Sequence, residues 1–349
     1  MKLVTFEYRG KRRVGALIAD RVLDFDVAAA GSYPAFSSMM ALIEAGPIAW
    51  DAAREIVAKA DQRASYGLAD VRLLAPLPRP TRLRDCSLFL EHMDVVLMRM
   101  AQDVAAREPD SEAAYERLMA TGKYTLNPIF KQKCVYYNAN HNSISGPEDE
   151  IVWPSYSNWM DFELEWACVF GLAGQNISRD CAAEHIFGFT ILNDWSARDV
   201  QMPLMDTMLG PGEGKDFTGS WGLGPCIITP DEVDDPYNLV MTARVNGKEW
   251  TRGSTGSMFH RFEDAIVQFS REKFILPGEV IGSGTVLGGC GFELEARTQR
   301  WSAGNSDRHG HSSRKLFFER QSRRRAKSGA TRSERSQRGS HSGGSTGAL

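Results

Sequence analysis

Two glutamates, Glu163 and Glu165, stand two residues apart in the mostly apolar segment 161–170. Alternate residues of a β-strand point to the same face, so we expect the two carboxylates to lie side by side. Like charges this close destabilise each other unless a cation lies between them or one carboxyl holds a proton. The plainer alternative is the solvated face of an edge strand. The apolar neighbours favour an interior strand and hence a cation site.

Three further polar residues, Asp194, Arg198 and Gln201, follow one another at spacings of four and three. On a helix expected over 195–201, these spacings place a carboxylate, a guanidinium and an amide on one face. The aspartate is also suited to cap the start of that helix, and both roles are compatible because a carboxylate has two oxygens. The pattern predicts a polar site or a capped helix.

A single lysine, Lys215, lies in the glycine-rich loop 210–222. The loop does not match a phosphate-binding P-loop, because Asp216 follows the lysine where Ser or Thr is required. Beside a metal, such a lysine would stabilise an anionic intermediate. The alternative is a solvated loop residue.

Asp85 and His92 are seven residues apart in a segment, 85–121, whose pattern predicts a helix. This spacing is about two helical turns, so both side chains are expected to face one cavity. The alternative is a histidine that only packs or caps. Few histidines occur in residues 1–296, so few side chains there are bases at neutral pH.

The elements that must position these residues follow from periodicity and turn signals. A strand meander followed by two helices, closed by a proline-rich linker at 76–80, indicates a small N-terminal domain at 1–75 and a catalytic domain at 76–296. Strands predominate and helices interrupt them, so the expected class is α+β, mainly β. The expected strands are 3–6, 13–18, 22–25, 161–170, 189–192, 226–229, 239–245 and 280–281, and the further expected helices are 36–45, 49–59 and 181–187.

The composition, with 349 residues of which 42% are hydrophobic and 24% charged, is that of a globular protein. Residues 1–296 carry a formal charge of −13 and residues 297–349 carry +10. An acidic body argues against a nucleic-acid partner, and no apolar run is long enough for a membrane span. Without a recognisable signal peptide we expect a cytoplasmic protein. The six cysteines form no C-x-x-C pair, so we expect reduced, mostly buried thiols rather than a zinc or redox site.

With these motifs in order, the sequence resembles the fumarylacetoacetate hydrolase superfamily. Its signature is a metal-binding E-x-E followed by an aspartate, here Glu163, Glu165 and Asp194. The resemblance covers roughly residues 1–295 and implies a rolled mixed β-sheet around a divalent cation, with a small β-rich N-terminal domain and a homodimeric assembly. Other stretches similar to the family are 131–133, 136–137, 140–144, 153–155, 193–199 and 284–285.

The resemblance also implies roles for single residues. Asp85 matches a further metal ligand, His92 a catalytic base and Thr285 a substrate contact, while Glu293 is the candidate for the carboxylate that orients His92. Ser87 stands where the fumarylacetoacetases have a substrate-binding tyrosine, which argues against fumarylacetoacetate itself as the substrate. Stabilisers of the oxyanion and carbanion match Arg198, Gln201 and Lys215.

The implied activity is metal-dependent hydrolysis of a C–C bond in a small 1,3-dicarbonyl acid, such as an acylpyruvate, in aromatic catabolism. Carboxylate ligands select Mg²⁺ or Ca²⁺, with Mn²⁺ as a further candidate, and the cation would act as template and Lewis acid. His92 would then take a proton from the attacking water. The alternatives are a 2-oxo acid decarboxylase, tautomerase or hydratase-isomerase at the same metal, and an inactive structural or binding homologue.

The basic tail 297–349 is rich in Ser, Arg and Gly and shows no strand period. This composition is typical of disorder. Relatives continue with apolar strands at this point, so our hypothesis is a shifted reading frame or a miscalled gene end.

Overall fold

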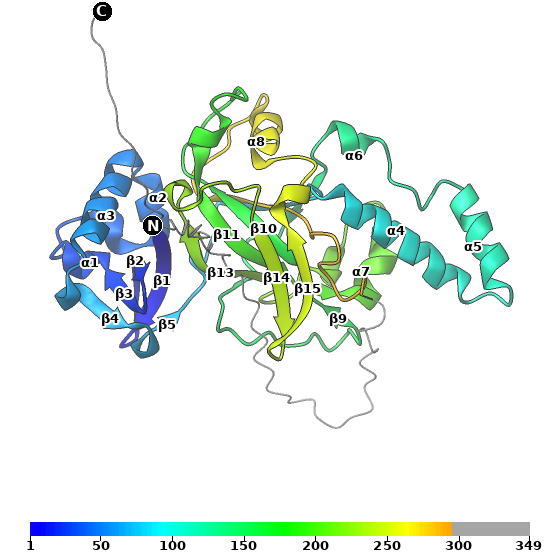
Figure 1. The fold of residues 1–349 in the computed structure, drawn as a ribbon, viewed down its shortest axis with the longest axis horizontal. Coiled ribbons are helices and arrows are strands. Elements are labelled where there is room, and N and C mark those ends of the chain that lie inside the picture. Colours follow the sequence, from blue (N-terminus) through cyan, green and yellow to red (C-terminus); the bar gives the residue numbers. More distant parts are fainter. Residues whose placement is uncertain (295–349) are drawn as a thin grey trace, which may run out of the picture.

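The computed structural model describes residues 1–294 (Figure 1). The tail 297–349 lies outside these residues, and its predicted disorder and shifted frame remain predictions. The strands are β1 Lys2–Tyr8, β2 Lys11–Ile18, β3 Arg21–Asp24, β4 Ser65–Gly67, β5 Arg72–Leu73, β6 Arg82–Cys86, β7 Tyr136–Ala139, β8 Ile144–Ser145, β9 Met160–Asp161, β10 Leu164–Phe170, β11 Ile186–Asp194, β12 Ser196–Ala197, β13 Trp221–Ile228, β14 Val240–Val245, β15 Lys248–Ser254 and β16 Glu279–Gly282. The α-helices are α1 Phe25–Ala28, α2 Met39–Glu44, α3 Pro47–Lys59, α4 Leu90–Ala105, α5 Ser111–Ala120, α6 Ile129–Gln132, α7 Arg198–Met205 and α8 Phe262–Ser270.

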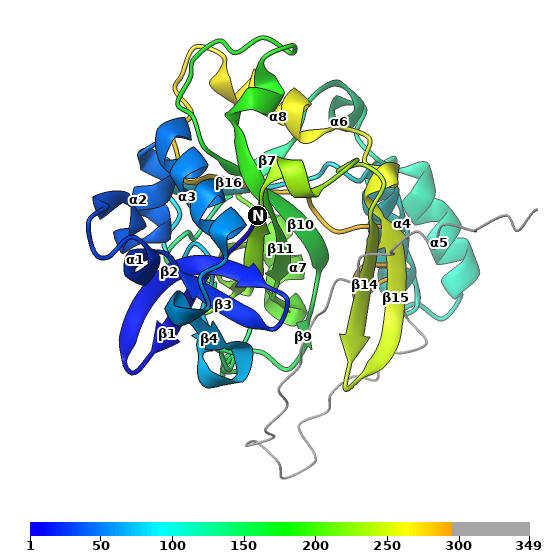
Figure 2. The same ribbon diagram turned by 60° about the vertical axis from the view of Figure 1, so that its left-hand side comes forward.

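Most strands belong to one twelve-stranded sheet, in the order β4-β3-β2-β1-β13-β11-β10-β16-β6-β7, with β5 beside β1 and β8 beside β13. The β6–β16 and β8–β13 pairs are parallel and the other pairs of this sheet are antiparallel, so the sheet is mixed. Helices lie around it (Figure 2). The predicted α+β class with a mixed sheet is confirmed.

The N-terminal segment forms the predicted meander, β1 to β3, with α2 and α3 packed beside it (blue in Figure 1). Strand β1 also pairs with β13, where Lys2 lies opposite Ile228. The sheet is therefore continuous from the N-terminal strands to those that carry the site. The division into domains at residues 75 and 76 remains a prediction.

Strand β10 is buried along its whole length because apolar residues cover both of its faces. Ala167 and Val169 join the cluster that includes α2 and the N-terminal strands. Trp166 and Cys168 join a second cluster that includes α8 and β14. The strand that carries Glu165 is thus an interior strand, and the edge-strand alternative is wrong.

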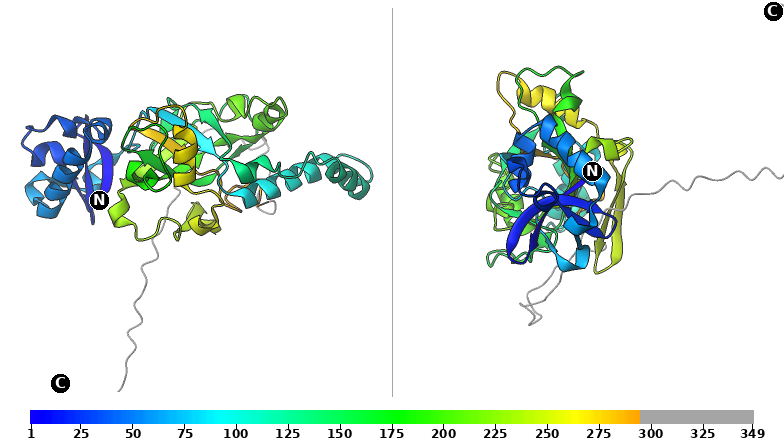
Figure 3. Two further views of the ribbon diagram at one scale, coloured as in Figure 1. Left: turned by 90° about the horizontal axis from the view of Figure 1, so that it is seen from above. Right: turned by 90° about the vertical axis from the view of Figure 1, so that its left-hand side faces the viewer.

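Two pairs of elements, one of strands and one of helices, lie outside the main sheet. Strands β14 and β15 form a separate two-stranded sheet beside it (Figure 2). Helices α4 and α5 form an arm that extends away from the N-terminal strands, seen from above in Figure 3. In the part of the chain that the structure describes, no helix is long and apolar enough to cross a membrane.

Two predicted elements that carry site residues are wrong in their placement. Asp85 does not begin a helix, because its backbone belongs to β6, which pairs with β16 on one side and β7 on the other. The helix begins only at Leu90, so Asp85 and His92 do not share a helical stripe. The helix predicted over 195–201 begins at Arg198, and Asp194 ends β11 instead of capping that helix.

Smaller differences concern 161–170 and 181–187. The first segment is not one continuous strand, because β9 ends at Asp161 and β10 begins at Leu164, with Glu163 in an isolated bridge to Cys290. The second is a 3₁₀ turn at Ala182–His185 followed by β11. All six cysteines are free, and five of them are buried, as expected.

Candidate functional site

Three buried carboxylates from nearby strands of the sheet lie close together: Asp85 from β6, Glu165 from β10 and Asp194 from the end of β11. One oxygen of each lies within 4.8 Å of one oxygen of the others. Among residues 1–294, no hydrogen-bond partner reaches Asp85 Oδ1, Glu165 Oε1 or Asp194 Oδ1. Buried polar atoms are almost always paired, so these three oxygens are suited to a cation.

Strand β16 separates β6 from β10 and leaves room for these side chains. Gly282 lies opposite both Asp85 and Ala167, and a Cβ there would come within 3.0 Å of Asp85 Oδ1 and 3.1 Å of Glu165 Oε2. Just beyond the strand, the Gly284 N–H donates to Glu165 Oε2 at 3.0 Å. Gly284 has a φ of +74°, and a Cβ would lie 2.1 Å from Cys86 O, so only glycine fits there.

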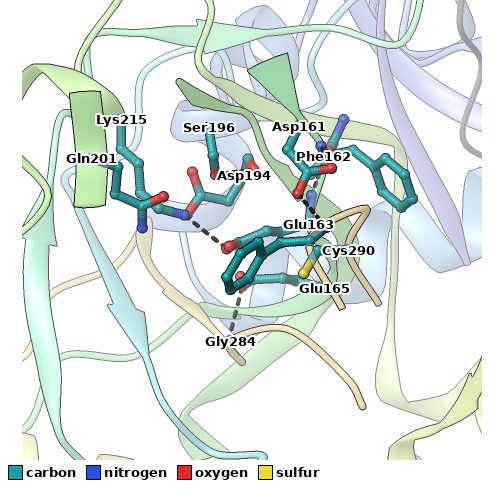
Figure 4. A network of polar contacts seen from close by, with 12 residues as sticks. Asp161, Phe162, Glu163, Glu165, Asp194, Ser196, Gln201, Lys215, Gly284 and Cys290 are labelled. Carbon is teal, nitrogen blue, oxygen red and sulfur yellow. Dashed lines mark hydrogen bonds and ion pairs between the residues drawn. The ribbon is translucent and has the colours of Figure 1, made fainter. Parts of the chain in front are cut away.

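Lys215, which Figure 4 shows, and Arg198 bring positive charge to the same site. Lys215 Nζ donates to Glu163 Oε2 at 2.7 Å and also contacts Asp194 Oδ2. Arg198 Nη1 donates to Glu163 Oε1 at 2.6 Å and to Gln201 Oε1 at 2.9 Å. Lys215 is therefore a buried site residue rather than a solvated loop lysine.

Burial and neighbouring charges shift the pKa values of the four carboxyl groups in this network. Burial raises the pKa of Asp85 to about 6, and burial also raises the pKa of Glu165 and of Asp194 well above the usual range. Burial alone would raise the pKa of Glu163, but Lys215 and Arg198 outweigh it and lower that pKa. Carboxylates that resist ionisation until a cation arrives are typical of a metal centre.

The predicted base, His92, pairs with Glu293 beside the cluster of carboxylates. His92 Nδ1 is 3.0 Å from Glu293 Oε2, and both residues are buried. His92 lies in the first turn of α4, and a positive charge on it would lower the pKa of Glu163. The structure thus brings together the histidine and the carboxylate that the sequence analysis paired.

The predicted substrate contact, Thr285, is buried directly after Gly284. Its neighbour Gly289 approaches so closely that a Cβ there would lie 2.8 Å from Thr285 Cγ2. The role of Thr285 in substrate binding remains a prediction.

Two residues of the network were missed by sequence reasoning. Asp161 accepts hydrogen bonds from Arg198 Nε at 3.0 Å and from the backbone N–H groups of Gly291 and Phe292 at 2.8 and 3.0 Å. Tyr137 donates its hydroxyl proton to Asp194 Oδ2 at 3.2 Å. An acid two residues before Glu163 was the available signal for Asp161, whereas nothing local distinguishes Tyr137 from Tyr136.

A divalent cation fits Asp85, Glu165 and Asp194, because one oxygen of each converges with the others and each residue has one buried oxygen without a hydrogen-bond partner in residues 1–294. An all-oxygen set suits a hard cation such as Mg²⁺, Ca²⁺ or Mn²⁺. Glu163, the fourth predicted ligand, is engaged by Arg198 and Lys215 instead. Its role as a ligand remains a prediction.

A mixed sheet that holds buried carboxylates beside a buried lysine, arginine and histidine is the arrangement of an enzyme active site. A family model described as the C-terminal domain of fumarylacetoacetate (FAA) hydrolase matches residues 101–329. The chain belongs to this family, as the sequence resemblance implied.

Relatives with assigned activities include oxaloacetate tautomerases. The chain is 41% identical over 228 residues to the mitochondrial oxaloacetate tautomerase FAHD2A of Homo sapiens, covering 60% of this chain and 71% of that protein. It is 28% identical over 230 residues to the oxaloacetate tautomerase YisK of Bacillus subtilis, covering 65% of this chain and 66% of that one.

Solved structures share the fold. A fumarylacetoacetate hydrolase from Exiguobacterium antarcticum aligns with a TM-score of 0.62 at 26% identity, covering 85% of this chain and 90% of that one. A maleylpyruvate hydrolase from Sphingobium sp. SYK-6, solved with manganese(II) and pyruvate, aligns with a TM-score of 0.60 at 21% identity, covering 83% and 90%.

Proposed function

We propose that the protein is a divalent-cation-dependent tautomerase that interconverts the keto and enol forms of a small 2-oxo dicarboxylic acid of the oxaloacetate type. The observation that carries this proposal is the convergence of three buried carboxylates, each with one oxygen that lacks a hydrogen-bond partner in residues 1–294, beside Lys215 and His92. The oxaloacetate tautomerases among the relatives support the reaction class. This reading replaces C–C hydrolysis as the first expectation.

The cation would be held by Asp85, Glu165 and Asp194, and it would neutralise negative charge that develops on the 2-oxo oxygen. Tautomerisation moves one proton between C3 and this oxygen, so the chain must supply a group that takes the proton and returns it. His92 is the described residue best placed for that task. With its Nδ1 facing Glu293, its Nε2 is the atom left to accept the proton from C3.

The basic residues suit an anionic substrate. Burial would lower the pKa of Lys215, but Asp194 and Glu163 outweigh it and raise that pKa, so the lysine stays charged. Arg198 is fixed by Asp161 and Glu163, and it orients Gln201. We propose that Lys215 stabilises the enolate while Arg198 and Gln201 hold the neighbouring carboxylate.

Hydrolysis of a C–C bond in an acylpyruvate is the second candidate, and the His92–Glu293 pair favours it. The same Nε2 that removes a proton from carbon is able to remove one from water, and both reactions need an enolate. The predicted small dicarbonyl acid substrate fits either reaction. The homodimer and the cytoplasmic location remain predictions.

One assay separates the two candidates. The enol form of oxaloacetate is mixed with the enzyme and Mg²⁺ or Mn²⁺, and the decay of its ultraviolet absorbance is compared with the uncatalysed decay. In parallel, acylpyruvates are tested for release of pyruvate. We expect accelerated enol decay without pyruvate release; rapid pyruvate release from an acylpyruvate with unaccelerated enol decay would establish the hydrolase instead.

A further inference from the structure

A second cluster of ligating atoms lies outside the carboxylate cluster. It consists of His92, Cys290 and Glu293, and one ligating atom of each lies within 4.8 Å of those of the others. Cys290 Sγ lies 3.5 Å from Glu293 Oε2, the oxygen that faces His92 Nδ1 at 3.0 Å. An isolated β-bridge pairs the backbone of Cys290 with that of Glu163, and Figure 4 shows Cys290 beside Glu163 and Glu165.

The cluster has unused binding capacity. Within the described residues, Glu293 Oε1 has no hydrogen-bond partner, and His92 Nδ1 faces Glu293 Oε2 at 3.0 Å without forming an aligned hydrogen bond. All three residues are more than nine-tenths buried. The His92 side chain is nevertheless 10% exposed, so the cluster is not fully sealed from solvent. Buried polar atoms without hydrogen bonds are costly, and a cation would satisfy them.

We propose that His92, Cys290 and Glu293 form a second cation site, specific for a borderline-soft ion such as Zn²⁺, and that its occupation inhibits the enzyme. The donor set is one nitrogen, one sulfur and one oxygen, which suits Zn²⁺ and not Mg²⁺. The neighbouring set of Asp85, Glu165 and Asp194 offers oxygen alone. Two adjacent sites thus differ in the chemistry of their donors.

Two of the three separations between donor atoms are close to those of tetrahedral zinc, and the third is within 4.8 Å. Bonds of about 2.0–2.3 Å place ligand atoms about 3.3–3.8 Å apart, with the fourth position open to water. The Cys290–Glu293 separation of 3.5 Å lies in this range, and the His92–Glu293 separation of 3.0 Å needs only a small adjustment. Burial raises the pKa of the Cys290 thiol, so without metal the sulfur is protonated. On binding, the thiol proton passes to solvent and the sulfur–zinc bond takes its place.

Inhibition follows because zinc would take the lone pair of His92 Nδ1, so that the neutral ring carries its proton on Nε2 and this atom can no longer accept one from C3. This consequence rests on the proposed function, whereas binding does not. Without a C-x-x-C pair, the sequence did not indicate the site, because its ligands lie on α4 and on the segment after β16.

The binding test uses Co²⁺ as a spectroscopic probe of the full-length protein in excess Mg²⁺. A thiolate bound to Co²⁺ produces a charge-transfer absorption in the near ultraviolet, which oxygen ligands do not produce. We expect this band in the wild type, its loss in Cys290→Ser, and its retention in Cys181→Ser, where the exposed thiol serves as the matched control. Absence of the band in the wild type, or its survival in Cys290→Ser, would overturn the site.

Two further readouts keep the test decisive. If Cys290→Ser does not fold, His92→Ala keeps the thiol and should weaken Co²⁺ binding by roughly tenfold or more, since one ligand is gone; unchanged affinity would overturn the site. Inhibition is measured as the ratio of rates with and without micromolar Zn²⁺ in excess Mg²⁺. In Cys290→Ser the rate with Zn²⁺ should approach the rate without it, whereas Cys181→Ser should remain inhibited. Equal inhibition of both variants would overturn the inhibitory role. A protein with no tautomerase activity that still shows the cobalt band would contradict only the proposed function.

Discussion

Glu163 and Glu165 have the same side chain and both reach the site, yet their partners differ. Glu163 is neutralised by Lys215 and Arg198, while Glu165 accepts one backbone N–H and is surrounded mainly by carboxylates. Their pKa values accordingly shift in opposite directions. Of the two, Glu165 belongs to the cluster that needs a cation, and Glu163 links that cluster to the basic residues.

Replacing His92 by alanine tests the assigned base. General-base catalysis is typically worth about 10²–10⁴-fold, so kcat for enol decay should fall by this order. Because His92 is outside the carboxylate cluster, the rise in melting temperature on adding Mg²⁺ should persist. His185→Ala is the matched control, since that histidine contacts Leu172 O away from the site and should keep full activity. A fully active His92→Ala protein would refute the assignment.

The positions of the carboxylates depend on how closely the strands β6, β16 and β10 approach one another. Gly282 on the middle strand faces the carboxylates of both neighbours, and the space that its missing side chain leaves is where their oxygens converge. Asp161 has a comparable role, because it ties Arg198 to the segment that carries Cys290 and Glu293. Strand register and a backbone anchor therefore set the geometry of the two clusters.

A methyl group at position 282 should disturb the carboxylates. The Cβ of Gly282→Ala would lie 3.0 Å from Asp85 Oδ1 and 2.7 Å from Leu192 Cδ2, so neighbouring atoms must move. We expect the Kd for Mn²⁺ to rise about 10–100-fold, as when groups that orient ligands are changed. Gly222→Ala is the control, because its nearest atom would be 3.4 Å away. Titration calorimetry measures both, and equal affinities would refute the argument from close approach.

Sequence periodicity located the strands better than the junctions between elements. The E-x-E strand and the N-terminal meander were predictable because their apolar residues alternate. Asp85 was misplaced because the polar, alternating residues of β6 merge without a turn signal into the helical pattern that follows. The contacts of Asp161, Tyr137 and Cys290 were not predictable, since they join segments far apart in the chain.

Asp85, Glu165 and Asp194 are buried close together in the sheet of the protein. The free energy of unfolding of the whole molecule therefore depends on pH and on the bound cation. Burial raises the pKa of Asp85 from 3.8 to about 6, so between these values the folded state binds more protons than the unfolded state. The free energy of unfolding of the metal-free protein therefore loses this contribution as pH rises through that window. A bound cation replaces the lost protons.

The stabilisation by Mn²⁺ should consequently be larger at about pH 7.5 than at about pH 5, because protons compete for the same oxygens at the lower pH. At about 100 times its Kd, the ion should add about 2.7 kcal/mol to the free energy of unfolding. Melting curves with chelator or with Mn²⁺ at both pH values measure this difference. Asp85→Asn should reduce it, and an equal effect of Mn²⁺ at both pH values would contradict the carboxylate site.

The most direct test of the metal-dependent tautomerase is the rate of oxaloacetate enol decay in chelator-stripped protein during titration with Mn²⁺. We predict a rate close to the uncatalysed one without metal. Adding Mn²⁺ should restore catalysis until about one ion is bound per chain, and this recovery should be abolished in a protein carrying Glu165→Gln and Asp194→Asn. Catalysis that is undiminished in the stripped protein, or fully retained in the double variant, would contradict it.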